Sequence, residues 1–186
     1  MSAQPVQQYA LTELARRAVE TFVRERRLIT EPLDSSHVLL HQPAPCFVCL
    51  KTLDRRLRGC IGTIEPARPT LWEEVVANAV GAATRDPRFH PVTKAELASL
   101  CYSVDVLERP EPTTFEELDP KVFGVVVEGG DSSRRGLLLP DIEGVETAAR
   151  QVEIAARKAG LPPHEPLKLY RFRVRRYKEP APAGTV

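Results

Sequence analysis

The stretch LRGCIGTIEP at residues 57–66 places a thiol, a cation and two glycines in a segment that otherwise reads as a β-strand. Side chains alternate across a strand, so Arg58, Cys60 and Gly62 are predicted to share one face. A nearby cation favours the thiolate and lowers the pKa of a cysteine, which would suit Cys60 to act as a nucleophile, a redox-active thiol or a soft ligand. The two glycines, Gly59 included, would let another group approach the backbone closely.

A structural role for Cys60 is the competing hypothesis. Free cysteine is among the most often buried residue types, and burial raises its pKa and makes it inert. Arg58 would then pair with an acidic neighbour such as Glu65. Both hypotheses stay open, and we take Cys60 and Arg58 as candidate catalytic residues. The candidate ligand-binding residues beside them are Gly59, Gly62 and Thr63.

A second group of chemically capable side chains lies in TRDPRFHP, after a predicted helix. In a functional arrangement, Asp86 would orient an arginine at a ligand site and His90 would serve as a base for Cys60. In the alternative, the segment is a helix-ending turn in which Asp86 accepts hydrogen bonds from local backbone groups and Phe89 fills the core. We take three of its residues as candidate ligand-binding residues: Arg85, Asp86 and Arg88.

The four cysteines are too few and too scattered for a small disulfide scaffold, so we expect them to be free thiols. CFVC at 46–49 has the spacing of a redox or metal motif. In a strand, however, Cys46 and Cys49 would point to opposite faces. The four histidines show no ligand spacing with this pair, and we predict neither a metal site nor a cofactor.

Composition indicates a globular protein whose charges nearly cancel, with 26 basic and 25 acidic residues in 186. Net charge therefore favours neither nucleic acid nor a membrane surface as a partner. The sequence has no apolar run of the roughly 18–20 residues that span a bilayer. The first residues also lack the pattern of a signal peptide, so we expect a cytoplasmic protein without membrane association.

The last predicted strand carries Arg171, Arg173 and Arg175 on one face, within a segment at 168–178 that has no acidic residue. With its tyrosines, such a strip could bind nucleic acid. A Lys- or Arg-rich strand face is more often simply solvated, and charges on edge strands also prevent aggregation. Nucleic-acid binding is therefore the less favoured interpretation.

The hydrophobic pattern predicts short strands joined mainly by hairpins, with helices between them. Such an order is typical of an α+β fold with antiparallel sheets rather than of a doubly wound parallel sheet. The expected helices are 9–28, 69–86 and 144–159, with a short one beginning at Thr93. The expected strands form hairpins at 46–64 and 122–140 and single strands at 99–108 and 167–177, and a helical turn is expected at 115–118.

Several motifs occur in one order: FVCLK followed by LRGCIGTIEP, AATRDPRFHPVTKAEL, YSVDVLERPE, GVVVEGG with RRGLLLPDIEGV, and ARKAGL with LYRFRV. Together they resemble the AMMECR family, in its bacterial form as protein A of the AmmeMemoRadiSam system. The resemblance implies a two-lobed α+β fold with antiparallel sheets flanked by helices and a cleft between the lobes. We expect a single domain over 9–178, a smaller lobe roughly within 54–106, and a flexible tail at 179–186.

The resemblance also implies partners. The name of the system joins the family to a Memo-like protein and a radical S-adenosylmethionine protein, although no activity of the family itself is established. We therefore expect a component of a three-part modification pathway with a ligand cleft lined by 58–62 and 85–88, and with Cys60 as its reactive group. The alternative is a non-catalytic binding or adaptor module, for a peptide, a partner protein or nucleic acid, in which LRGCIGT is structural.

Two residues depart from the family pattern. Cys49 stands where the pattern usually has a hydroxyl or another small residue. His90 follows DPRF at a position where many relatives have proline or other residues. The second departure weakens any mechanism that requires a histidine there.

Overall fold

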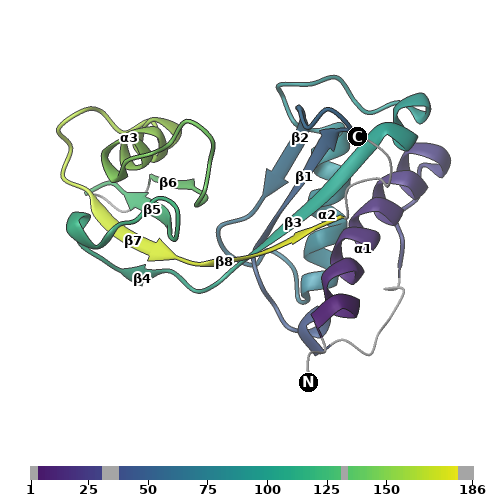
Figure 1. Cartoon of the computed structure of the whole chain (residues 1–186), viewed down its shortest axis with the longest axis horizontal. Helices are drawn as coiled ribbons and strands as arrows, with labels where there is room; N and C mark the ends of the chain where they lie inside the picture. Colours follow the sequence, from purple (N-terminus) through teal and green to yellow (C-terminus); the bar gives the residue numbers. More distant parts are fainter. Residues whose placement is uncertain (1–3, 31–37, 131–133, 180–186) are drawn as a thin grey trace. The chain divides into compact units, whose positions relative to one another are not determined.

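A computed structural model describes residues 4–30, 38–130 and 134–179, with the side chains of 4–9 left undescribed. The chain forms two compact units, Met1–Val106 with Arg176–Val186, and Leu107–Arg175. Each unit has its own four-stranded sheet and its own helical cover (Figure 1). The predicted α+β class with antiparallel sheets is confirmed.

The first unit contains two long helices, two short 3-10 helices and a sheet ordered β2-β1-β3-β8. Its elements are α1 (Gln4–Glu25), η1 (Val38–His41), β1 (Cys46–Thr52), β2 (Leu57–Gly62), α2 (Leu71–Thr84), η2 (Lys94–Ser99), β3 (Leu100–Leu107) and β8 (Val174–Lys178). Both β2 and β3 pair antiparallel with β1. Strand β2 forms one edge of this sheet.

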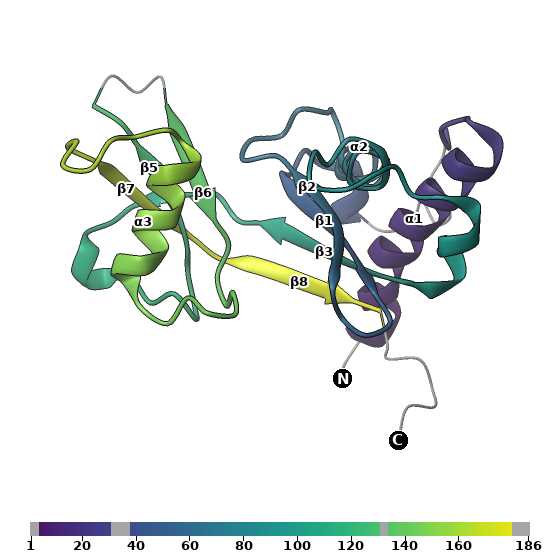
Figure 2. The ribbon, with the colours of Figure 1, turned by 90° about the horizontal axis from the view of Figure 1, so that it is seen from above.

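One face of this sheet packs against the helices. The even-numbered residues of β1 and β3 other than Thr52, such as Val48 and Val104, are buried in one cluster with the apolar sides of α1 and α2. Figures 1 and 2 show both helices beside this sheet. The odd-numbered residues of β1, among them Phe47 and Cys49, are partly exposed on the other face. We call this second face, which α1 and α2 leave uncovered, the open face.

Helices α2 and η2 begin at the capping residues that the sequence predicts, Thr70 and Thr93. The backbone N–H of Glu73 donates to Thr70 Oγ1 at the start of α2. Thr93 and Glu96 form the predicted capping box at the start of η2. Because these hydrogen bonds satisfy backbone N–H groups that a helix leaves unpaired, they fix where each helix begins. The segment between α2 and η2, which contains DPRFH, lies beside β2, where Asp86 accepts a hydrogen bond from the Cys60 N–H.

A β-bulge interrupts the hairpin of β1 and β2. Leu50 lies opposite Gly59 and Lys51 lies opposite Leu57, so Arg58 is the extra residue. A bulge bends the strand locally and can redirect a side chain. Gly59 faces α2 so closely that a β-carbon there would lie 2.1 Å from the carbonyl oxygen of Ala82. Only glycine therefore allows α2 to pack at this distance.

In its described residues, the second unit has a four-stranded sheet, one α-helix and one short 3-10 helix. Its elements are β4 (Glu111–Pro112), η3 (Phe115–Glu117), β5 (Gly124–Glu128), β6 (Arg135–Leu138), α3 (Ala148–Lys158) and β7 (Lys168–Phe172), with sheet order β4-β7-β5-β6. All three pairings in this sheet are antiparallel. Apolar residues of α3 pack on β5 and β6 in a core separate from that of the first unit.

Two features of the organisation differ from expectation. The expected smaller lobe at 54–106 belongs to the first unit, because β2, α2 and β3 share its core. The expected terminal strand breaks at Arg173, so that β7 joins one sheet and β8 the other. The expected strand at 167–177 is long enough to contribute residues to both sheets. Of the expected tail, Glu179 accepts hydrogen bonds from Arg16 and from the backbone of Tyr102, and the remainder lies outside the described residues.

Candidate functional site

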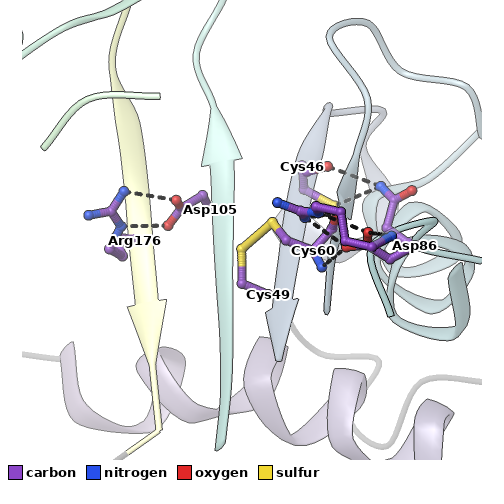
Figure 3. Close-up of a disulfide and its surroundings, with 8 residues drawn as sticks. Cys46, Cys49, Cys60, Asp86, Asp105 and Arg176 are labelled. Carbon is purple, nitrogen blue, oxygen red and sulfur yellow. Dashed lines mark hydrogen bonds and ion pairs between the residues drawn. A yellow bond between two sulfur atoms is a disulfide. The ribbon is translucent and has the colours of Figure 1, made fainter. Parts of the chain in front are cut away.

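The edge of β2 is held by Asp86 of the DPRFH segment (Figure 3). The backbone N–H of Cys60 donates to Asp86 Oδ2 at 2.8 Å. Arg88 donates to the same carboxylate from its backbone N–H, from Nε and from Nη2. Asp86 therefore closes a backbone position on the edge strand and fixes the direction of an arginine.

Burial and the ion pair act in opposite directions on the pKa of Asp86, and the ion pair prevails. Its side chain is 2% exposed, whereas that of Arg88 is 53% exposed. The hydrogen bonds from Arg88, with those from the Cys60 and Arg88 backbone, hold the pKa of the Asp86 carboxyl well below its ordinary value despite burial. The same ion pair raises the pKa of Arg88. Both expected roles of Asp86 occur together: it binds backbone groups and it orients an arginine.

Arg58, the bulge residue, reaches η2. Its Nε donates to Glu96 Oε1 at 2.7 Å and its Nη2 donates to Glu96 Oε2 at 3.2 Å. Its guanidinium also lies 5.8 Å from the centre of the Phe89 ring. Among the described residues, its buried Nη1 has no hydrogen-bond partner. This nitrogen is therefore a buried donor without a partner in the described part of the chain.

Glu96 is held by hydrogen bonds from Arg58 of β2 and from Thr93, the residue that caps η2. It accepts hydrogen bonds from Arg58 and from the backbone and hydroxyl of Thr93. These contacts, those from Arg58 foremost, lower its pKa from an ordinary 4.5 to about 2. The carboxylate is therefore ionised throughout the physiological range and keeps the Arg58 guanidinium in place. Glu96, not the expected Glu65, is the ion-pair partner of Arg58.

Arg58 and Arg88 line a pocket of about 390 Å³ together with Pro87, Phe89 and His90. Phe89 lies between them, with the Arg88 guanidinium 5.5 Å from its ring centre. The volume is in the range of small-molecule sites. All five lining residues belong to the first unit. The wall of the pocket carries guanidinium, imidazole and aromatic groups.

The carboxylates that orient the arginines do not line the pocket. Asp86 and Glu96 bind the Nε and Nη2 groups of their arginines, which leaves the Nη1 groups without a carboxylate partner among the described residues. Guanidinium groups recognise carboxylates and phosphates by charge and by paired hydrogen bonds. The arrangement is therefore chemically suited to an anionic group.

Cys60 is joined to Cys49 by a disulfide across β1 and β2 (Figure 3). This finding corrects the expectation of four free thiols. The hairpin places the two residues directly opposite each other, so the bond needs no distant part of the chain. Because the Cys60 sulfur is bonded to Cys49, it carries no proton for His90 to accept. A nucleophilic role for Cys60 requires prior reduction.

The other two cysteines differ in environment. Cys46 faces the core, where burial raises the pKa of its thiol to about 12 and Asn78 donates a weak hydrogen bond to its sulfur. It is therefore inert. Cys101 is a partly exposed thiol on β3 opposite Lys51, and so on the same face as Cys49. The predicted opposite directions of Cys46 and Cys49 are found.

The remaining candidate ligand-binding residues have structural contacts instead of pocket contacts. A β-carbon on Gly62 would lie 2.2 Å from the Phe47 ring, and Thr63 donates to the buried Glu74 carboxylate. Arg85 ends α2 through a backbone hydrogen bond to Gly81. Gly59 packs on α2. The pocket thus includes Arg58 and Arg88 of the predicted set.

The arginines of the last strands are largely engaged with carboxylates. Arg171 pairs with Glu111, and Arg175 with Glu108. Arg173 stacks on Phe123, with its guanidinium 4.4 Å from the ring centre. A strip whose charges are paired in this way offers fewer free cations to phosphates than the sequence suggested.

Sequence reasoning missed three parts of the site: Pro87 and Phe89 as pocket walls, Glu96 as the partner of Arg58, and Cys49 as the partner of Cys60. Arg58 and Glu96 are 38 residues apart, and no local pattern links them. The sequence did contain a pattern that indicates the disulfide. A hairpin that turns at 53–56 puts position 49 opposite position 60, and both are cysteine.

These features define a class of protein: two α+β units, the first with an arginine-lined pocket at the edge of its sheet. A family model described as AMMECR1 matches residues 12–178, so the chain belongs to the AMMECR1 family. The predicted resemblance is confirmed.

Relatives and a solved structure agree with this assignment. A protein from Thermotoga maritima is 47% identical over 164 residues, which cover 87% of this chain and 93% of that protein. A Clostridium acetobutylicum protein is 50% identical over 133 residues, 72% of this chain but 28% of its own length. The crystal structure of an uncharacterised protein from Pyrococcus horikoshii has a TM-score of 0.85, with 32% identity and 96% and 95% of the two chains covered.

No helix in the described part of the chain has the length and apolar character needed to cross a membrane.

Proposed function

We propose that this protein is a ligand-binding component of a modification pathway and that its pocket takes a small molecule bearing a carboxylate or phosphate. The observation that carries the proposal is the wall of the pocket. Arg58 and Arg88 both line it, while the carboxylates that fix them do not. Electrostatic attraction and directed hydrogen bonds then act on the same ligand group.

Preorganisation strengthens the case for a binding site. Each arginine is held in one orientation by two or more hydrogen bonds to a carboxylate, so little side-chain freedom is lost when a ligand binds. The Phe89 ring offers a flat apolar surface beside both cations.

Inorganic phosphate is a direct probe of this proposal. We expect isothermal titration at constant ionic strength to show saturable binding to the full chain. Arg88→Gln or Arg58→Gln should weaken it about tenfold or more, the effect of losing one charged hydrogen bond. Arg17→Gln is the matched control, because Arg17 is exposed on α1.

Two results would count against the anion site. Phosphate heat that does not saturate would show only screening of surface charge. Equal weakening in Arg17→Gln and Arg88→Gln would place the binding elsewhere. Circular dichroism of each variant checks that a loss of binding is not a loss of fold.

The partners that the family resemblance implies, a Memo-like protein and a radical S-adenosylmethionine protein, are the proposed partners of this chain in that pathway. In this proposal Cys60 supplies the reactive group after reduction of its disulfide. The experiment is co-expression of the three proteins, with capture through a tag on this chain. Recovery of neither partner would argue for a protein that acts alone.

The alternative function is a non-catalytic adaptor, in which Cys60 has only a structural role in the sheet. Cys60→Ser separates the two functions, because serine occupies nearly the same volume without a thiol. Retention of pathway function in a folded Cys60→Ser protein would favour the adaptor. Loss of function with the fold intact would favour the reactive group.

A further inference from the structure

The Cys49–Cys60 disulfide lies on the open face of the first sheet. Both residues are partly exposed. They are directly opposite each other on β1 and β2, and the Cys60 N–H points away from β1 to Asp86. They therefore form a non-hydrogen-bonded pair, the kind in which facing side chains lie closest. A thiol from solution can reach this face of the sheet.

The disulfide is not needed to bring its strands together. The two cysteines are 11 residues apart in one hairpin, and β1 and β2 pair from Phe47 with Gly62 to Lys51 with Leu57. Backbone hydrogen bonds and the packing of Gly59 on α2 hold this register independently. After reduction the two thiols would still face each other, so the bond can re-form without a search through other conformations.

We propose that Cys49 and Cys60 form a redox-active pair that undergoes thiol–disulfide exchange with an external dithiol, either a small molecule or a protein. This inference stands apart from the anion pocket and uses different atoms. Exchange with the external dithiol would also reduce the disulfide, as a reactive Cys60 requires.

The exchange balances without any further reactant. A thiolate of the external dithiol attacks one sulfur of the pair, which breaks the Cys49–Cys60 bond and forms a mixed disulfide. The released cysteine leaves as a thiolate and takes a proton. The second thiol of the dithiol then attacks the mixed disulfide, which frees the other cysteine. Two electrons and two protons pass from the dithiol to the pair, and the dithiol becomes a disulfide.

The chain contains its own controls for this chemistry. Cys46 is buried with a raised pKa, so it should not react in the folded protein. Cys101 is a partly exposed thiol on the same face, so it should react whether or not the pair is reduced. Any reagent that labels Cys46 reports unfolding.

The test is differential alkylation of the full chain in buffers with a varied ratio of reduced to oxidised dithiothreitol, read by peptide mass spectrometry. We expect Cys49 and Cys60 to become labelled together and reversibly as the ratio rises, with Cys46 unlabelled throughout. Labelling of the pair only together with Cys46 would mean that the bond is structural. Complete labelling in fully oxidised buffer would mean that the pair does not form. Either result would overturn the proposal.

A variant tests the role of Cys49. With glutathione disulfide, Cys49→Ser should accumulate glutathione on Cys60, because the facing thiol that would displace it is absent. The reduced parent protein should instead return to the Cys49–Cys60 disulfide. Cys101→Ser is the control and should behave as the parent does. Equal glutathione on Cys60 in the parent and in Cys49→Ser would show that Cys49 does not act as the partner.

Discussion

At the scale of single residues, Asp86 connects the edge strand to the pocket. It joins the backbone of the edge strand β2 to the guanidinium of Arg88, from a nearly inaccessible position. A buried carboxylate in such a place is stable only because charged and backbone donors surround it. Its removal should affect the fold and the pocket together.

Asp86→Asn keeps the size of the side chain but loses the charge that holds Arg88. We expect the free energy of unfolding to fall by about 2 kcal/mol, the magnitude for hydrogen bonds to charged groups. Urea unfolding followed by circular dichroism measures it. Glu13→Gln, an exposed acid on α1, is the control and should change stability by less than about 0.5 kcal/mol. An equal loss of unfolding free energy in the two variants would show that Asp86 does not have this structural role.

The Arg58–Glu96 pair predicts a specific pH dependence. Since the pKa of Glu96 falls from 4.5 to about 2 on folding, its contribution to stability is complete above pH 4.5 and is lost as the pH falls toward 2. The stability difference between the parent and Glu96→Gln should therefore be largest above pH 4.5 and shrink below it. Urea unfolding across this range measures the difference. A gap that is constant with pH would mean that Glu96 is not held by Arg58.

At the scale of elements, the packing of β2 on α2 depends on a missing side chain. Gly59→Ala would drive a β-carbon into the Ala82 carbonyl, which is backbone and cannot rotate away. We expect a loss of about 2–3 kcal/mol in the free energy of unfolding, or failure to fold. Gly130→Ala is the matched control, because a β-carbon there meets nothing within 4 Å. A stable Gly59→Ala protein would contradict the close approach of α2.

Local patterns predicted the elements well and the site only in part. The capping residues Thr70 and Thr93 and the alternation of β3 are short-range signals, and the structure follows them. Arg58, by contrast, depends on a bulge, whose register comes from the partner strand. The Cys60 disulfide likewise depends on pairing across a hairpin. Simple alternation therefore missed the partner of Arg58, Glu96, and the partner of Cys60, Cys49.

At the scale of the whole molecule, the described residues form two cores that have no buried residue in common. The main chain passes from the first unit to the second after Val106 and returns before Arg176. The resemblance to the family predicted two parts, but not this division. Hydrophobic periodicity identifies which faces are buried and does not say which elements share a core.

Separate cores predict separate local stabilities. Leu138→Ala should remove about 2–5 kcal/mol of packing from the second unit. We expect faster amide hydrogen exchange in β5, β6 and α3, with β1 and β3 protected as in the parent. Val48→Ala in the first unit is the reciprocal variant. Equal loss of protection in both units from either variant would show a single cooperative core.

The central claim is that Arg58 and Arg88 present donors to an anionic ligand. Nitrogen NMR of the arginine side chains observes these donors directly during a titration with inorganic phosphate. Saturable shifts of the terminal Nη–H resonances of Arg58 and Arg88 are expected, because their Nε–H groups already donate to Glu96 and Asp86, while the resonances of Arg17 stay in place. Resonances that do not move, or that all move in proportion to ionic strength, would contradict it.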